Sequence, residues 1–349
     1  MDKPLLKNIL QQFKVDTTNV SFTTINQGYI NDTFLVSINN TPTYILQRIN
    51  VNVFKDAKGL HNNIELTLKQ LKHEKYHSIA LIKTNDDKPF YSLENDIWRI
   101  LTYVEDSVAY NHTSNNTIAF EAGRIIGCFH SLLQHENTND YPDTLPLLNY
   151  LPFRITEFNE ALSNTSNERK TIAKTEVDFA LENLTQFDAF YKADLPLRVC
   201  HNDTKLNNIL FHKDNSGLCL IDLDTIMKGY FHYDFGDAVR TAVSQSNEDE
   251  KDLSKIKFNL DLFKSFIEGL NNNDAFLTAQ EISYLPIACA LMPFMHGLRA
   301  LTDYLNGNIY YKVAYENQNL DRCRSLFRFS QLALENKEAI TSIINNELA

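Results

Sequence analysis

The sequence has few cysteines, a deficit of basic residues and no long apolar run, and each shortage excludes a class of protein. Its five cysteines are scattered through 349 residues without a C-x-x-C pair, which predicts a reducing compartment. No group of histidines and cysteines has the spacing of a zinc site. The net charge of -11 argues against nucleic acid or an anionic membrane as a partner, because neutralising phosphates requires a basic face.

Signals for secretion or membrane insertion are also missing. The first ten residues are interrupted by charge and lack the apolar stretch of a signal peptide. The most hydrophobic stretch, residues 284–298, is shorter than a bilayer span and contains Pro286 and Pro293, which predicts a kinked, buried helix. We therefore expect a cytoplasmic protein, and the sequence leaves its oligomeric state open.

The residues that are present predict a globular protein of two lobes. Apolar residues make up 43% of the chain, and its length exceeds that of a typical single domain. Helical periodicity appears over residues 56–72 and in several segments after residue 118, including 151–162 and 170–190. Strands are expected at residues 20–26, 33–38, 43–49, 77–83, 88–92 and 97–104. The predicted fold class is α+β, with a small antiparallel sheet in residues 1–105 and a mostly helical lobe in residues 106–349.

One loop concentrates polar side chains between two apolar strands, in residues 199–211. Its polar residues follow the order H-x-D-x-K-x-x-N, which brings a base, a cation and an amide together from one turn of backbone; they are His201, Asp203, Lys205 and Asn208. A further apolar strand at residues 218–221 then leads to Asp222 and Asp224. Taken singly, the His-x-Asp pair could be an ordinary turn, and Asp222 could be a strand-end cap.

Taken together, these residues suit phosphoryl transfer, in which catalysis consists mostly of positioning and charge neutralisation. Asp203 is predicted to accept the proton of an attacking hydroxyl, and Lys205 to lie near the transferred group. Asn208 and Asp222, with Asp224 as a further ligand, are predicted to hold magnesium against the phosphates of a nucleotide.

The loop resembles the catalytic loop of protein-kinase-like enzymes, and the I-D-L-D of residues 221–224 stands where kinases carry D-F-G. The I-D-x-D form points to the aminoglycoside phosphotransferase and choline kinase branch. The motifs at residues 28–33, 45–50, 233–237 and 301–307 are similar to bacterial N-acetylhexosamine 1-kinases. The resemblance implies a two-lobe kinase-like fold, catalytic roles for His201, Asp203 and Lys205, and ATP and Mg²⁺ bound between the lobes. It implies transfer of the γ-phosphate to the anomeric hydroxyl of N-acetylglucosamine or N-acetylgalactosamine.

The resemblance also implies a nucleotide site in the first lobe. The turn at residues 27–32 should cover the phosphates, although it lacks G-x-G-x-x-G, and Tyr103 and Glu105 belong to the expected adenine hinge. The third strand carries Gln47-Arg48 where kinases have a lysine, and alternation turns only one of the two toward the cleft. Three alternatives are open: Arg48 supplies the cation for the phosphates, Arg48 is an exposed residue of an edge strand, or the lobe lacks such a cation. Glu65 is the candidate partner of the cation. The residues expected to contact the nucleotide are Gly28, Asn31, Asp32, Thr33, Arg48, Tyr103 and Glu105.

For the acceptor, the resemblance places Arg299, Asp303, Tyr304 and Tyr311 beside Asp203 in a sugar site. The alternative is a helix ion pair between Arg299 and Asp303, which are four residues apart. Rival functions are a kinase for choline, an aminoglycoside or another sugar, and a catalytically silent nucleotide-binding protein. A choline site favours an aromatic cage, and the chain has one tryptophan. Two further acidic residues have structural interpretations: Asp234 as a helix cap and Asp237 as a brace for the catalytic loop.

Overall fold

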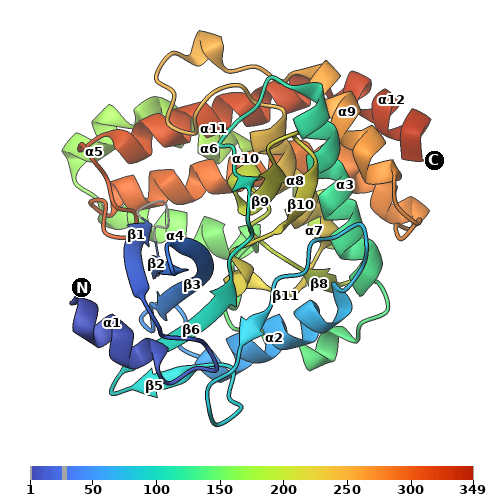
Figure 1. Cartoon of the computed structure of the whole chain (residues 1–349). Coiled ribbons are helices and arrows are strands. Elements are labelled where there is room, and N and C mark those ends of the chain that lie inside the picture. The colour runs from blue at the N-terminus through green and yellow to red at the C-terminus, as the bar shows by residue number, and fades with distance from the viewer. Residues whose placement is uncertain (1, 26–29, 349) are drawn as a thin grey trace.

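The computed structural model describes residues 2–25 and 30–348 and has two lobes (Figure 1). The small lobe contains a six-stranded sheet whose pairs are antiparallel, in the order β1-β2-β3-β6-β4, with β5 also pairing with β6. Its strands are β1 (Val20–Ile25), β2 (Asp32–Ile38), β3 (Thr41–Ile49), β4 (Leu81–Ile82), β5 (Tyr91–Leu93) and β6 (Asp96–Thr102). Asn39 and Asn40 both have positive φ in the tight turn between β2 and β3, a conformation that asparagine tolerates.

The two faces of this sheet have different chemistry. Helix α1 (Lys3–Leu10) covers one face, where Leu6, Ile9 and Leu10 pack in one cluster with Leu46 and Trp98. Since successive side chains on a strand point to opposite faces, the neighbours of Leu46 and Trp98 in sequence face the other way, toward the large lobe. The α1 side is therefore the apolar core of the small lobe, and the opposite side is free for chemistry.

Helix α2 (Ala57–Gln70) lies between β3 and β4 in sequence and packs against the large lobe. Asp56 caps its N-terminus by accepting the N–H of Gly59 at 2.8 Å. Its buried residues Leu60 and Ile64 belong to the core of the large lobe rather than to the α1 cluster. The predicted helix over 56–72 is thus confirmed, with its apolar stripe facing the large lobe.

The large lobe is mostly helical and forms the green-to-red body of Figure 1. Its helices are α3 (Asn116–Leu133), α4 (Leu151–Asn164), α5 (Asn167–Ile172), α6 (Lys174–Asn183), α7 (Asp188–Lys192), α8 (Phe231–Ala242), α9 (Leu260–Asn271), α10 (Ala279–Leu305), α11 (Gln318–Glu335) and α12 (Lys337–Leu348). Helices α3 and α9 cross closely at Gly123 and Gly269, where an added Cβ would lie 1.9 and 1.8 Å from carbonyl oxygens of the facing helix. Only glycine permits that approach.

Short strands in the large lobe hold the polar loops. Strand β8 (Arg198–Cys200) pairs with β11 (Met227–Gly229), and β9 (Ile209–His212) lies between β10 (Gly217–Leu220) and β7 (Ser107–Val108). Strand β6 ends at Thr102, and β7 pairs with β9 of the large lobe, so the chain leaves the small-lobe sheet between these two strands. The predicted fold class is confirmed.

Some predicted elements differ in extent. The strand expected over 77–83 is reduced to β4, and the helix expected over 170–190 is three short helices, α5 to α7. In helix α10, the capping box of Thr278 and Glu281 is present, and Pro286 and Pro293 lie within the helix. Of the helices that the structure describes, α10 alone is long and apolar enough to cross a membrane, and 83% of its most apolar window is buried.

Candidate active site

The polar loop between β8 and β9 is held in place by helix α8. The carboxylate of Asp234 accepts the backbone N–H groups of His201 and Asn202 at 2.7 and 2.6 Å, and His130 Nε2 lies 2.9 Å from it. The hydroxyl of Thr204 donates to the carbonyl oxygen of Asp234 at 2.5 Å. With three donors on one buried carboxylate, the loop has a fixed conformation.

Neither aspartate of α8 has the role expected from the sequence. Asp234 was predicted to cap this helix, but the N-cap residue is Tyr230, and Asp234 braces the catalytic loop from the first turn. Asp237 was predicted to brace the loop, but its Oδ1 lies 2.7 Å from Arg240 Nε and 3.1 Å from His296 Nε2. Although burial alone would raise the pKa of Asp237, the Arg240 guanidinium outweighs it and lowers that pKa strongly.

Asp203, the predicted base, is partly exposed at the centre of the loop. Its Oδ2 accepts Lys205 Nζ at 2.9 Å and Asn208 Nδ2 at 2.8 Å. Enclosure would lower the pKa of Lys205, but the carboxylates of Asp203 and Asp222 outweigh it and raise that pKa, so Lys205 is a permanent cation. The structure thus brings Asp203, Lys205 and Asn208 together as predicted, within hydrogen-bonding distance of one another.

Asp222 and Asn208 form a second part of the site. The Ile221 N–H donates to the Asn208 carbonyl oxygen at 2.8 Å, which joins the two segments directly before Asp222. Asp222 is exposed within the cleft and has a φ of 62°, a conformation that costs free energy in most residues. Enclosure by the cleft walls, then the charges of Asp224 and Asp203, raise the pKa of Asp222 to about 6. Crowded carboxylates beside an amide oxygen suit a hard divalent cation such as Mg²⁺.

His201, predicted to be catalytic, has a different position. Its side chain is fully buried, and its Nε2 lies 2.9 Å from the carbonyl oxygen of Ile221. Through this contact His201 connects the catalytic loop to the residue before Asp222. The geometry gives it a positioning role, because a sealed ring cannot reach a substrate.

The structure shows which of Gln47 and Arg48 on β3 faces the cleft, a point that the sequence left open. Gln47 faces the large lobe, whereas Arg48 lies opposite Trp98 in the register and shares its face of the sheet. Arg48 Nε donates to Asp32 Oδ2 at 2.8 Å, and Arg48 also pairs with Asp96. The predicted use of Arg48 as the phosphate-binding cation is therefore wrong, because its guanidinium is neutralised on the outer face.

The other predicted nucleotide residues divide into three groups. Gly28 lies outside the described residues. Asp32 is engaged by Arg48 on the outer face, whereas Thr33 Oγ1 accepts Gln47 Nε2 at 3.2 Å on the cleft side. In the hinge, the Tyr103 N–H donates to Thr43 at 3.0 Å and Glu105 is exposed, and their contact with adenine stays a prediction.

The sequence analysis missed Arg99, on β6. Its Nε and Nη2 donate to Gln47 Oε1 at 2.9 and 2.7 Å, and its Nη1 forms an ion pair with Asp224. Asp224, predicted as a metal ligand, also accepts Asn31 Nδ2 at 2.6 Å, so both of its oxygens are engaged by the small lobe. The available signal was a single charged residue inside the apolar run Ile97 to Leu101. Glu65, the candidate partner of the strand cation, pairs instead with Lys83.

The acceptor residues are only partly brought together. Enclosure would lower the pKa of Arg299, but the nearby phenols of Tyr311 and Tyr310 and the carboxylates of Glu157 and Asp203 raise it, which places Arg299 near the predicted base. Asp303 does not pair with Arg299 and instead accepts the N–H groups of Tyr310 and Tyr311 at 2.7 and 3.0 Å.

Asp303 thus anchors the loop that follows α10, which connects it to α11. The aromatic ring of Tyr311 lies under the Arg322 guanidinium, 5.0 Å from its centroid. Tyr304 is buried, and Arg169 lies over its ring at 4.7 Å. The prediction that Tyr304 contacts the acceptor is wrong, because one step along a helix turns a side chain by about 100°.

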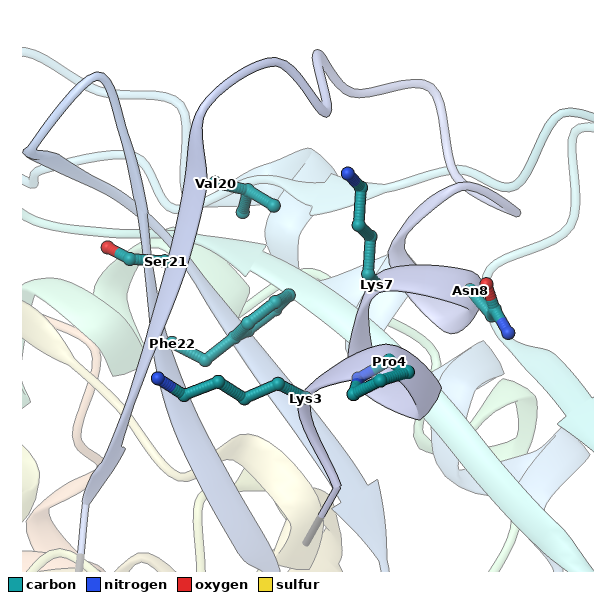
Figure 2. A pocket seen from close by; sticks show the side chains of 7 residues that line it. All are labelled: Lys3, Pro4, Lys7, Asn8, Val20, Ser21 and Phe22. Carbon is teal, nitrogen blue, oxygen red and sulfur yellow. The ribbon is translucent and has the colours of Figure 1, made fainter.

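Two hollows lie outside this centre. A polar one of about 360 Å³ is lined by Asp32, Arg48 and Asp96 of the small lobe and by Lys312 of the loop after α10. The other, of about 400 Å³, lies between α1 and β1, where Lys3 and Lys7 flank Phe22 (Figure 2). It is lined by none of the predicted site residues and lies against α1 rather than against the large lobe.

Comparison with known proteins places this site in a family. Residues 21–254 match the model of the phosphotransferase enzyme family. The match covers more than half of the chain, so the protein belongs to this family and is a phosphotransferase. The resemblance to the aminoglycoside phosphotransferase and choline kinase branch is confirmed at this level.

Solved structures share the fold at low identity. The microcompartment-associated aminopropanol kinase has a TM-score of 0.59 and 16% identity, over 97% of this chain and 99% of that one. An aminoglycoside phosphotransferase from Alicyclobacillus acidocaldarius has a TM-score of 0.62 and 11% identity, over 98% and 96%. Choline kinase from Cryptosporidium parvum has a TM-score of 0.59 and 14% identity, over 99% of each chain.

Proposed function

We propose that this protein is a small-molecule kinase that transfers the γ-phosphate of ATP, with Mg²⁺, to the anomeric hydroxyl of an N-acetylhexosamine. The product would be N-acetylglucosamine 1-phosphate or N-acetylgalactosamine 1-phosphate. The observation that carries the proposal is the contact of Asp203 with both Lys205 and Asn208 beside Asp222. Phosphoryl transfer needs these groups together in one cleft.

Each group has a distinct task in this reaction. Asp203 accepts the proton of the attacking hydroxyl, and the two hydrogen bonds to its Oδ2 leave Oδ1 for that hydroxyl. Lys205, a cation over the physiological pH range, offsets charge on the transferring phosphoryl group. Asn208 Oδ1 and Asp222 would hold Mg²⁺, which would neutralise the nucleotide phosphates. A relative of the same fold, an amicoumacin kinase, was solved with AMP-PNP and Ca²⁺.

The choice of a neutral sugar is supported by the charge near Asp203. Among residues 2–25 and 30–348, the guanidinium group of Arg299 has no hydrogen-bond or ion-pair partner. Enclosure and the charge of Arg299 lower the pKa of Arg154, so two guanidinium groups lie near each other. Such a site disfavours a cationic acceptor and offers N–H donors to sugar hydroxyls and an acetyl carbonyl.

A second candidate is a kinase for a cationic amino alcohol or aminoglycoside. It is favoured by the solved structures that share the fold, which include an aminopropanol kinase, a choline kinase and aminoglycoside phosphotransferases. Both candidates use the same phosphoryl-transfer centre and differ only in what lies beside Arg299.

An acceptor screen separates the candidates. ATP consumption would be measured with N-acetylhexosamines, other hexoses, choline, ethanolamine, aminopropanol and aminoglycosides, and the product of the best acceptor examined by phosphorus NMR. We expect the highest kcat/KM for an N-acetylhexosamine and a phosphate on the anomeric carbon. Preferred use of a cationic acceptor, or phosphate on the primary hydroxyl, would refute the sugar 1-kinase proposal and leave the phosphotransferase class intact.

A further inference from the structure

Arg99 is a fully buried guanidinium at the boundary between the lobes. Its side chain is 1% exposed, and that of its partner Asp224 is 2% exposed. The two residues are 125 positions apart in sequence, with Arg99 on β6 of the small lobe and Asp224 in the short 3₁₀ turn η3 (Leu223–Thr225) of the large lobe. Burying two charges is costly and is tolerated only when they neutralise each other.

Asp224 connects the large lobe to two separate parts of the small lobe. One oxygen pairs with Arg99, and the other accepts Asn31 Nδ2 at 2.6 Å. Asn31 Oδ1 in turn accepts the Asn50 N–H at 2.9 Å, just after β3. Because Asn31 directly precedes β2, the Asp224 carboxylate fixes where that end of the sheet lies over the cleft. Gln47 completes the arrangement by holding two of the Arg99 donors.

Helix α2 contributes a neutral side chain to this region. Burial and then the charge of Arg99 lower the pKa of His61 to about 4, and His61 Nε2 is buried without a partner among the described residues. Glu65, one turn further along α2, pairs with Lys83 instead. The carboxylate that neutralises Arg99 therefore comes from the large lobe and not from α2.

This pairing acts directly on the turn that carries Asp222. Asp222 lies two residues before Asp224 and has a φ of 62°, which the surrounding structure must enforce. An anchored Asp224 holds the C-terminal side of this turn, and the contact of His201 with Ile221 holds the N-terminal side. Without the anchor, the Asp222 carboxylate would lose its fixed orientation.

We propose that Arg99 is a positioning residue for the nucleotide: its ion pair with Asp224 joins the lobes and orients Asp222 and the Asn31 segment toward the metal and phosphates. Arg99 acts through Asp224 and does not touch the nucleotide. The inference rests on the phosphotransferase reaction of the proposed function and is independent of which acceptor is used.

The test combines single and double variants in a thermodynamic cycle. The variants are Arg99→Gln, Arg99→Lys, Asp224→Asn and the double variant Arg99→Gln/Asp224→Asn. Calorimetry without acceptor gives the Kd of ATP with and without Mg²⁺, and steady-state kinetics give kcat and the KM for ATP and for the best acceptor of the screen. Melting curves establish that each variant is folded.

We expect each neutralising single variant to raise the Kd of ATP with Mg²⁺ roughly tenfold or more, because removal of one partner leaves a buried charge unpaired. The acceptor KM should stay within about threefold, since the pair lies on the nucleotide side. The double variant should be no worse than the worse single variant, which is the signature of two residues that act as one unit. Arg99→Lys should recover part of the loss, because lysine restores the charge but lacks the fork that holds both Gln47 and Asp224.

Arg324→Gln is the matched control, because it also breaks an Arg–carboxylate pair with a buried partner, Glu176. This pair joins helix α11 to helix α6. This variant should lower the melting temperature without changing nucleotide affinity. The proposal is overturned if Arg99→Gln behaves like this control. It is also overturned if the losses from Arg99→Gln and Asp224→Asn multiply, because Arg99 would then act independently of Asp224. If Arg99→Gln does not fold, the Asp224→Asn arm still decides, since unchanged ATP affinity there contradicts the proposal. Failure of every acceptor would leave the calorimetric results unaffected.

Discussion

Replacing Asp222 with asparagine should stabilise this protein while removing its activity. In the absence of a metal, Asp222 holds a carboxylate near those of Asp224 and Asp203, and this crowding adds to its enclosure in raising its pKa to about 6. The residue also has a φ of 62°, in the left-handed region that asparagine adopts with little strain. Both features should make the folded protein more stable with asparagine than with aspartate at position 222.

The size of the effect follows from the pKa. A rise from 3.8 to about 6 would correspond to about 3 kcal/mol for a charge sealed from water. Asp222 is exposed within the cleft, however, and solvent screening reduces this to about 1 kcal/mol. For a protein of this size, that amounts to a rise in Tm of about 1–3 °C.

The pH dependence separates the charge from the backbone effect. The carboxylate is destabilising only while it is ionised in the folded state, so the gain of Asp222→Asn should be full above pH 6. It should shrink as the pH falls through 6 and vanish only below about pH 3, where the carboxyl is protonated in both states. Any gain from the positive φ does not change with pH. Calorimetric melting without metal at pH 7.5, 6 and 4.5 measures both parts.

Asp106→Asn is the control, since Asp106 also has a positive φ, but its hydrogen bond to Lys213 lowers its pKa. The Asp106 variant should show no charge-dependent gain. Equal melting temperatures for Asp222→Asn and the unmodified protein at pH 7.5, or a gain that is the same at pH 4.5, would refute the idea that clustered charge destabilises the empty site. Calorimetric titration with ATP should show that Asp222→Asn loses most of the Mg²⁺-dependent affinity for ATP.

Three further outcomes are expected. Asp203→Asn should lower kcat by about 10²-fold or more while sparing ATP binding, because it removes a general base, and near-normal turnover would exclude this role. Lys205→Ala should reduce turnover more than Arg48→Ala, since Arg48 is paired on the outer face; the reverse order, measured by ADP release, would contradict the assigned geometry. Arg299→Ala should raise the KM for the acceptor by roughly tenfold, the value of one charge-assisted hydrogen bond, with ATP affinity unchanged; improved use of choline would support the electrostatic argument, and an unchanged KM for the sugar would count against it.

The sequence predicted the elements and residues that depend on local order. The spacing of Asp203, Lys205 and Asn208 within one loop brings them together because two short strands hold the loop ends. The alternating strands of the small lobe are an equally local signal, and they are present. These features depend on neighbours within a few residues, so a single sequence contains enough information to locate them.

Residues whose roles depend on which face they occupy were harder to predict. Tyr304 follows Asp303 directly and yet packs under Arg169, and Asp303 turned out to hold the backbone of Tyr310 and Tyr311. Nothing near Asp303 in sequence specifies that the chain beyond α10 folds back over it. A buried carboxylate that accepts two backbone N–H groups from a later loop depends on tertiary structure, so the residues next to it in sequence do not predict it.

The position of the small-lobe cation illustrates the same limit. Protein kinases place a lysine on the third strand and pair it with a glutamate from the following helix. Here the residue on the cleft face of β3 is Gln47, and its cross-strand neighbour on β6 is Arg99. Moving the cation by one strand changes its partner from the helix to Asp224 of the opposite lobe. The charge that would have joined two elements of one lobe thus joins the two lobes themselves. The arrangement of the lobes thus includes one buried ion pair, and only the cross-strand register, which no local motif encodes, reveals it.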